Sequence, residues 1–443
     1  MARQMKDSGV EWIGQIPEDW DVARLCDIKS EKKFAIVDGP FGSAISTNDY
    51  REKGVPLIRI SNLKNGEVSE EDMVYISEEL AESVRRSCIG LSDIVFAKTG
   101  ATIGKCGINR LIKYGILASS CIKISISHKY NCDYFYYIFS TDQFNQALRN
   151  TCTGTTRDTI NLTPFSKLNV LLPPYCIQNR VASYLDRKCA QIDAIISKQQ
   201  QIIEKLKEYK LSVITEAVTK GLDPNVPMKD SGIDFIGSIP ETWRICRLRN
   251  IGTLQNGISK GGEFFGHGFP FVSYGDVYRN FSLPVQVAGL IDSSDEERRN
   301  YSVESGDIFF TRTSETIEEV GFSSVCEETI PDATFAGFLI RVRPFTDDLV
   351  PKFAKYYFRS NHHRYYLVKQ MNLVTRASLG QDLLKSMPVL VPPKDEQISI
   401  AAYLDKKCGA IESSIEYKQR VIERLIAYKK SLIYEVVTGK KEV

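Results

Sequence analysis

The chain has 443 residues, of which 43% are hydrophobic, enough for about three packed domains of ordinary size. Its 57 Lys and Arg residues nearly balance its 55 Asp and Glu residues and leave a formal net charge of +2. This balance excludes a uniformly basic nucleic-acid coat and an acidic disordered tail, so any DNA contact has to come from local patches. No apolar stretch is long enough to cross a membrane and no export signal is recognisable, so we expect a cytoplasmic protein without a membrane partner.

The sequence contains an internal duplication. Residues 5–25 recur at 228–248 with 13 of 21 positions identical. Residues 173–219 recur at 392–438 with 22 of 47 positions identical. A repeat of about 220 residues is too long for a solenoid unit and indicates a duplicated two-part module.

The segments between the repeats, 26–172 and 249–391, differ strongly in sequence but keep two weak echoes. SDIVFAKTGATIGK (92–105) aligns with GDIFFTRTSETIEE (306–319), and TTRDTINLTPFSKLNVLLPP (155–174) aligns with VTRASLGQDLLKSMPVLVPP (374–393). Both segments alternate short β-rich runs with Gly, Asn and Pro, which predicts two α+β domains of one fold with different surfaces. The expected strands lie at 55–60, 93–99, 121–127 and 338–344, and the expected helices near 132–149 and 350–370.

Each repeated end is predicted to be a long helix. Apolar residues return at heptad spacing after a double proline, which is typical of a coiled-coil seam. About 45 residues would extend about 65 Å, so each helix is expected to act as a spacer. The predicted seam consists of Ile192, Ile202, Leu206, Tyr209, Val213, Ile411, Val421, Leu425, Tyr428 and Leu432.

The connectivity predicts how these parts are arranged. The linker 221–227 is too short to return along the first helix, so we expect the second globular domain at its far end and the two helices antiparallel. The C-terminus then returns to the first domain. The predicted domains are a first globular domain at 1–173, a first helical repeat at 174–220, the linker, a second globular domain at 228–392 and a second helical repeat at 393–443.

Two different globular domains joined by a helical spacer suit a bipartite ligand, and double-stranded DNA is the obvious candidate because its equivalent groove faces recur every turn. Residues 349–381 contain six basic residues, several aromatics and no acid. Such a segment could bind phosphates, or it could be an amphipathic helix with a solvated basic face. The predicted DNA contacts are Lys98, Thr99, Lys105, Arg157, Arg312, Lys355, Arg359, Arg364 and Arg376.

Each of these contacts has a structural alternative. The turns around Gly100 and Gly104 bring the backbone close to a phosphate, or they are only hairpin turns. Arg157 and Arg376 occupy equivalent positions in the TTR and VTR echoes, where an arginine reads a guanine or forms a fold-supporting ion pair.

No catalytic motif is complete. GATIGKC (100–106) has three residues between its glycines where a P-loop needs four, and a cysteine where it needs Ser or Thr. The eleven cysteines are scattered without a CxxC pair and there are only four histidines, which argues against a zinc site. We therefore expect no catalytic residue, no metal site and no bound cofactor in this chain.

Three motifs resemble one family. GxIPxxW occurs at 14–20 and 237–243, GDIxF at 306–310, and PPxxxQxxIAxYLD at 392–405. Together they resemble the specificity subunit of type I restriction-modification enzymes, along nearly the whole chain. The first helix departs slightly from the pattern, with Asn179-Arg180 where the other copy has Ile398-Ser399.

The resemblance implies a non-catalytic subunit whose two target-recognition domains each read one half of a split DNA sequence. It also implies two modification subunits that bind S-adenosylmethionine and methylate adenine, and motor-endonuclease subunits that use ATP and Mg²⁺. The helices would set the gap between the half-sites and dock the methyltransferases. The alternative is a coiled-coil scaffold that bridges proteins without binding DNA.

Overall fold

The computed structural model describes residues 4–42, 44–152, 158–314, 320–370 and 377–443. It divides into two compact units: unit 1 comprises Met1–Lys198 and Arg420–Val443, and unit 2 comprises Gln199–Gln419. Each unit holds one globular domain and part of each long helix. The compact units therefore differ from the predicted domains, in which each helical repeat stood by itself.

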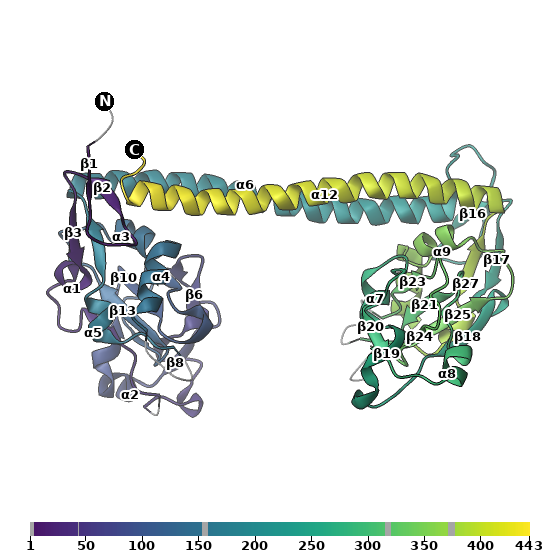
Figure 1. Cartoon of the computed structure of the whole chain (residues 1–443), viewed down its shortest axis with the longest axis horizontal. Helices are drawn as coiled ribbons and strands as arrows, with labels where there is room; N and C mark the ends of the chain where they lie inside the picture. Colours follow the sequence, from purple (N-terminus) through teal and green to yellow (C-terminus); the bar gives the residue numbers. More distant parts are fainter. Residues whose placement is uncertain (1–3, 43, 153–157, 315–319, 371–376) are drawn as a thin grey trace. The chain divides into compact units, whose positions relative to one another are not determined.

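Unit 1 is built around a six-stranded sheet (Figure 1). All five residues of its central strand β10 are buried, and β10 pairs antiparallel with β13 and β11. In order, the strands are β4 (Ile36–Asp38), β13 (Cys121–Ser125), β10 (Asp93–Ala97), β11 (Cys106–Ile108), β7 (Glu67–Val68) and β6 (Leu63–Lys64). A second sheet has the order β8 (Val74–Ile76), β5 (Val55–Ile58), β12 (Gly115–Leu117) and β9 (Cys88–Ile89).

The helices of unit 1 cover the first sheet with aromatic side chains. Phe96 on β10 packs against Phe139 and Phe165, with ring centroids 5.2 and 5.3 Å apart. Each buried ring removes a large apolar area from water, so these contacts contribute strongly to the core. The helices are α1 (Leu25–Ile28), α2 (Glu78–Ser83), α3 (Cys132–Phe139), α4 (Asp142–Asn150) and α5 (Leu162–Ser166).

Unit 2 repeats the central sheet in the same strand order and directions. Its strands are β18 (Gly252–Asn256), β25 (Leu339–Pro344), β21 (Ile308–Thr311) and β23 (Ser323–Val325). The second sheet contains β20 (Gly289–Ile291), β19 (Phe265–Val272) and β24 (Thr334–Phe335), and β24 runs parallel to β19 as β12 does to β5. The helices are α7 (Tyr274–Arg279), α8 (Asp295–Asn300), α9 (Pro351–Tyr357), α10 (Asn361–Gln370) and α11 (Gln381–Ser386). The prediction of two α+β domains of one fold is confirmed.

The GxIPxxW repeat forms the same hairpin in both units. Gly14 and Gly237 have φ values of 69° and 70°, a backbone conformation that favours glycine. Trp20 and Trp243 are fully buried. The hairpin strands are β1 (Met5–Asp7) with β2 (Gln15–Pro17), and β15 (Met228–Asp230) with β16 (Ser238–Pro240); β3 (Asp21–Arg24) and β17 (Arg244–Arg247) then pair with β14 (Asn169–Leu172) and β27 (Pro388–Val391).

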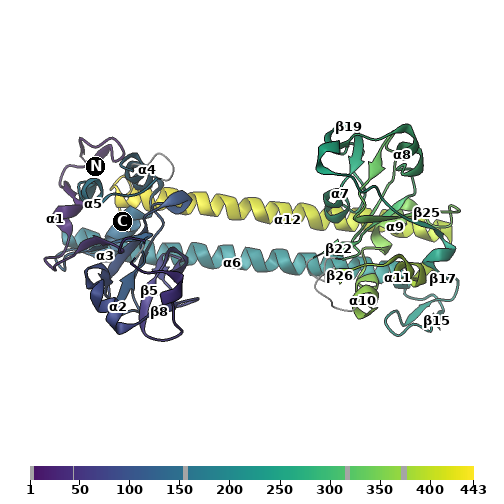
Figure 2. The ribbon, with the colours of Figure 1, turned by 90° about the horizontal axis from the view of Figure 1, so that it is seen from below.

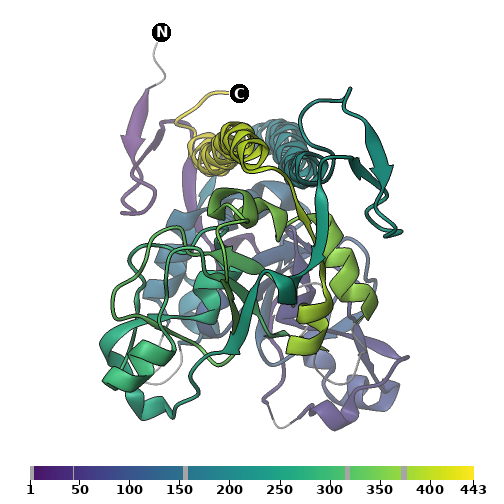
Figure 3. The same ribbon diagram turned by 90° about the vertical axis from the view of Figure 1, so that its right-hand side faces the viewer.

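The long helices are α6 (Tyr175–Lys220) and α12 (Lys394–Val437). Within each unit their segments lie side by side (Figure 2), and Figure 3 shows the segments of unit 2 along one side of its globular domain. In unit 2, Lys418 donates to Gln199 at 3.2 Å and Lys210 pairs with Glu412, so the helices run antiparallel as predicted. None of the described helices is both long and apolar enough to cross a membrane.

The C-terminal end of α12 belongs to unit 1. The hydroxyl of Tyr134 on α3 donates to the carbonyl of Val437 at 3.1 Å. A Cβ on Gly439 would come within 2.5 Å of Pro17 and 3.1 Å of Trp20, so the segment after the helix packs on the first hairpin. The predicted return of the C-terminus to the first domain is confirmed.

The predicted seam is wrong at two tyrosines. Tyr209 and Tyr428 are 54% and 52% exposed, while Ile192, Ile411 and Leu432 are buried as predicted. Partial burial is found at Ile202, Leu206, Val213, Val421 and Leu425.

The reason for this error is the period of the apolar pattern. The fully buried isoleucines of α6 are Ile192, Ile203 and Ile214, which are spaced by eleven residues. Eleven residues fit three turns at 3.67 residues per turn, close to the 3.6 of a straight helix. A heptad drifts off this stripe and reaches exposed positions by Tyr209.

Candidate nucleic-acid interface

Lys98 follows the central strand of unit 1 and is held on both sides. Its N–H donates to the carbonyl of Ser120 at 2.7 Å, and its carbonyl accepts from the N–H of Ile160 at 3.0 Å. Its Nζ lies 2.6 Å from Asp38 Oδ2, and both side chains are less than one-fifth exposed. Arg86 Nη2 lies 3.6 Å from the other oxygen of Asp38. Lys98 is thus bound within its domain, beside a more exposed arginine.

Arg312 occupies the same place in unit 2. Its N–H donates to the carbonyl of Phe338 at 2.9 Å, and its carbonyl accepts from the N–H of Leu379 at 2.7 Å. The equivalence that the alignment of 92–105 with 306–319 predicted is confirmed at this position. We call these two ends of the central strands the Lys98 edge and the Arg312 edge.

The acidic partner is not repeated at the Arg312 edge. Asn256 pairs with β25 where Asp38 pairs with β13, and it accepts a hydrogen bond from Gln381 at 3.0 Å. One domain therefore carries a carboxylate at a position where the other carries an amide. The two domains thus differ in local charge at a position where their backbones have the same conformation and pairing.

The turn that follows Lys98 begins at Thr99 and ends at Lys105. Thr99 forms a β-bridge to Thr159, and Lys105 is exposed. The turn is fixed from behind, because Arg149 Nη2 on α4 donates to the carbonyl of Ile103 at 2.8 Å. Lys105 is therefore exposed to solvent on a turn whose backbone is held by Arg149.

Arg157 and Arg376 lie outside the described residues, but the segments next to them are placed. Thr159 pairs with Thr99, and β26 (Ala377–Ser378) pairs with β22 (Thr313–Ser314). The described residues that follow the TTR and VTR sequences therefore lie at the Lys98 edge and the Arg312 edge.

Three predicted cations of unit 2 have partners inside the domain. Lys355 Nζ lies 3.1 Å from Glu327 Oε1 and 3.0 Å from Asp405 Oδ1, and is 13% exposed. It joins the globular domain to α12. Its charge thus lies in shielded ion pairs and not on a solvated basic face, the structural alternative for this segment.

Arg359 and Arg364 are likewise engaged. Arg359 donates to the backbone carbonyls of Ser323, Val277, Tyr278 and Asn280, and burial lowers the pKa of its guanidinium to about 10. Arg364 donates to the carbonyl of Val320 and lies 5.0 Å from the Phe322 ring. The structure gives both side chains places in the packing of the domain rather than on an open basic face.

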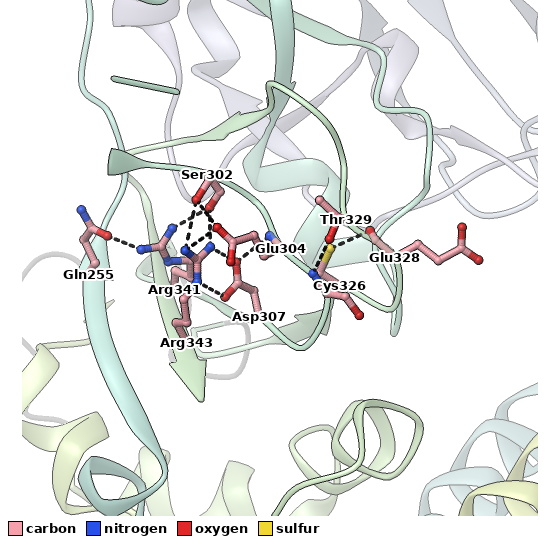
Figure 4. Close-up of polar contacts among 10 residues, drawn as sticks. Gln255, Ser302, Glu304, Asp307, Cys326, Glu328, Thr329, Arg341 and Arg343 are labelled. Carbon is pink, nitrogen blue, oxygen red and sulfur yellow. Dashed lines mark hydrogen bonds and ion pairs between the residues drawn. The ribbon is translucent and has the colours of Figure 1, made fainter. Parts of the chain in front are cut away.

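The GDIxF motif forms a buried polar network (Figure 4). The carboxylate of Asp307, which is 1% exposed, accepts from Arg343 Nε at 2.8 Å and Nη2 at 2.6 Å, and from the backbone N–H of Glu304 at 2.8 Å. Arg341, two residues earlier on β25 and on the same face, donates to the carbonyl of Ser302. The motif is thus a structural element that joins β21 to β25.

Unit 1 builds the same network with different residues. Asp93 accepts from Lys123 Nζ at 2.6 Å, from the Ser125 hydroxyl and from the backbone N–H of Gly90 at 2.8 Å. Lys123 and Asp93 are 6% and 8% exposed. A buried charge is tolerated only when paired and hydrogen-bonded, which explains why the aspartate recurs.

Two exposed phenylalanines were missed by the sequence analysis. Phe41 is 87% exposed and Phe338 is 63% exposed. A cation in the sequence predicts a DNA contact by its charge, whereas an apolar residue carries no such signal. The signal was present as an aromatic residue beside glycine in GPFGS (39–43) and AGF (336–338).

The described residues contain no cluster of His, Cys, Asp or Glu that could hold a metal ion.

The chain matches the family model of the type I restriction modification DNA specificity domain twice, at 17–208 and 240–422. It is 23% identical to the specificity subunit of the type I restriction enzyme EcoKI from Escherichia coli K12, over 89% of this chain and 83% of that protein. It is also 23% identical to the putative specificity subunit MjaX of Methanocaldococcus jannaschii, over 97% and 96%.

Solved structures show the same fold. A chain from a type I restriction-modification complex superposes with a TM-score of 0.71 at 15% identity, covering 95% of this chain and 98% of that chain. The HsdS subunit of Thermoanaerobacter tengcongensis superposes with a TM-score of 0.53 at 15% identity, covering 96% and 98%. The likeness covers both globular domains and both long helices.

Proposed function

This chain belongs to the family of type I restriction modification DNA specificity domains and is a specificity subunit, a DNA-recognition component, and from that premise we propose how it reads DNA. The first target-recognition domain reads one half of a bipartite DNA sequence and the second reads the other half. The Lys98 edge and the Arg312 edge face the DNA, and the two long helices set the gap between the half-sites.

The observation that carries this proposal is the equivalence of the two edges. Lys98 and Arg312 occupy equivalent backbone positions in two sheets of the same strand order, and the described residues that follow Arg157 and Arg376 pair beside them. The loops around these positions differ in sequence, which is what two readers of different half-sites require. Lys105, Arg157, Arg312 and Arg376 are the proposed contacts.

Lys98, Thr99, Lys355, Arg359 and Arg364 have a different proposed part. Their side chains or backbones are bound within the unit, so they support the fold around the edges or, for Lys355, the joint to α12, instead of reaching bases. A residue that holds a reading loop in place affects affinity without reading sequence.

We further propose that the chain is non-catalytic and acts in the cytoplasm. Two modification subunits bring S-adenosylmethionine and dock on the helices, where Tyr209 and Tyr428 stand exposed at equivalent positions. Motor-endonuclease subunits bring ATP and Mg²⁺. A scaffold that bridges proteins without binding DNA is not supported by the family membership.

The test is methylome sequencing of cells with and without this gene, in the presence of the modification subunit. We expect one bipartite adenine-methylated motif that disappears with the gene. The purified chain alone should transfer no methyl group. A motif that persists without the gene, or methylation by the chain alone, would contradict the proposal.

A further inference from the structure

Each recognition domain carries a strongly exposed phenylalanine, and a single exposed apolar residue is common in folded proteins. Position distinguishes these two from the rest. Phe41 is 87% exposed and Phe338 is 63% exposed, and both lie at the end of the central sheet where the Lys98 edge and the Arg312 edge were defined.

In unit 1 the chain is clamped just before Phe41. The N–H of Gly39 donates to the carbonyl of Cys121 at 2.9 Å, and a Cβ on Gly39 would come within 1.9 Å of the Ala118 carbonyl oxygen. Only glycine fits such a close approach. The preceding residue, Asp38, is the partner of Lys98 and Arg86. Phe41 therefore follows two residues beyond a fixed point, at the end of the sheet where Asp38 pairs with Lys98 and Arg86.

In unit 2 the backbone of Phe338 itself is held by hydrogen bonds. The carbonyl of Phe338 accepts the N–H of Arg312 at 2.9 Å, and the N–H of the preceding Gly337 donates to Ile258 at 2.7 Å. A Cβ on Gly337 would come within 2.2 Å of Ser259 Oγ, so this backbone is also tightly packed. The ring of Phe338 is exposed on a rigid base next to the cation at the Arg312 edge.

We propose that Phe41 and Phe338 are specificity-determining residues that make apolar contact with base edges, one in each half-site. The proposal rests on the proposed function and adds the residues that read. The proposed contacts Lys105 and Arg312 would hold phosphates at the two edges, while an apolar side chain in the major groove distinguishes the thymine methyl group from a bare base edge. An exposed ring on fixed backbone loses little conformational freedom when it binds.

The sheets provide matched controls. Leu111 in unit 1 is 58% exposed and Phe345 in unit 2 is 62% exposed, but both lie at the opposite end of the same sheets. Leu111 follows Asn109, whose carbonyl accepts from Ser92 before β10 begins, and Phe345 follows the last residue of β25. Leu111→Ala and Phe345→Ala thus remove similar apolar area away from the edges.

The experiment uses the full chain assembled with its modification subunits, on duplexes that carry the methylated motif and on duplexes with each position changed. Phe41→Ala should weaken binding at least about fivefold, relax preference within one half-site and leave the other intact. Phe338→Ala should do the same in the other half. The slope of log affinity against log salt should stay unchanged, because no phosphate contact is lost.

Leu111→Ala and Phe345→Ala should bind as the unsubstituted complex does. The inference is overturned if Phe41→Ala and Phe338→Ala match these controls, or if they weaken all sequences equally. In either case the unsubstituted complex would still recognise its bipartite motif, so the proposed function would stand. A complex with no motif at all would overturn both.

Discussion

The hydroxyl of Tyr137 on α3 donates a hydrogen bond to the carboxylate of Asp186 on α6 at 2.7 Å. Tyr356 on α9 makes the same bond to Asp405 on α12, also at 2.7 Å. The two bonds are 219 residues apart in sequence, the offset of the helical repeat. They show that the duplication preserved the joint between recognition domain and helix while the edges diverged.

Loss of this joint should be measurable as a loss of stability. Tyr137→Phe and Tyr356→Phe each remove one hydrogen bond from a buried ring to a carboxylate, which should lower the free energy of unfolding by about 1.5–3 kcal/mol. Urea unfolding of the full chain measures this. Tyr209→Phe, on an exposed ring of α6, should change nothing, and an equal loss there would mean that the joint has no special role.

The buried aspartate of the central strand should be far more sensitive. Asp93→Ala leaves Lys123 as a buried cation without its partner, and should destabilise unit 1 by about 3–5 kcal/mol. Adding Lys123→Met removes the stranded charge and should recover much of that loss. Thermal unfolding of the single and double variants decides this, and a double variant no more stable than Asp93→Ala would show that the ion pair is not the cause.

His363 in unit 2 predicts an acid sensitivity. Burial lowers the pKa of its imidazole to about 3, whereas the unfolded chain binds the proton near pH 6.5. Protonation therefore favours the unfolded state, and the stability that neutral His363 contributes is complete above about pH 6.5 and is lost as the pH falls toward 3.

Between pH 7 and pH 5 this effect should cost about 2 kcal/mol. His363→Asn should reduce the difference in unfolding free energy between the two pH values by that amount, whatever its effect at pH 7. An unchanged pH dependence in His363→Asn would refute the assignment.

Arg157 and Arg376 test the proposed contacts. If an arginine reads a base, its replacement by alanine should cost about 1–3 kcal/mol of binding and relax one position of one half-site. A phosphate contact would instead weaken binding to every sequence and lower the salt slope by about one. Binding by the assembled complex as tight and as selective as before would show that neither arginine touches DNA.

The fold could be read from the sequence because the duplication is visible in it. The recurrence of residues 173–219 at 392–438 predicted two long helices, and the SDI and GDI echoes predicted one sheet in both domains. The helix seam failed because a heptad was assumed where Ile192, Ile203 and Ile214 follow an eleven-residue period. Both patterns fit a short stretch, and only the packing tells them apart.

The site was harder to predict, because charge does not reveal where a side chain points. Arg359 belongs to a run of six cations without an acid, yet its guanidinium donates its hydrogen bonds to backbone carbonyls within the domain. The four carbonyls lie on β23 and on or next to α7, far from Arg359 in sequence. Phe41 and Phe338 were overlooked for the converse reason, since a phenylalanine in isolation predicts a core position.

The most direct test of the central claim is an exchange of residues 26–172 for the corresponding segment of another specificity subunit, followed by methylome sequencing. The account predicts a motif in which one half-site is replaced by that of the donor, while the other half-site and the spacer remain. A motif changed in both halves, or in neither, would contradict two independent readers on a common frame.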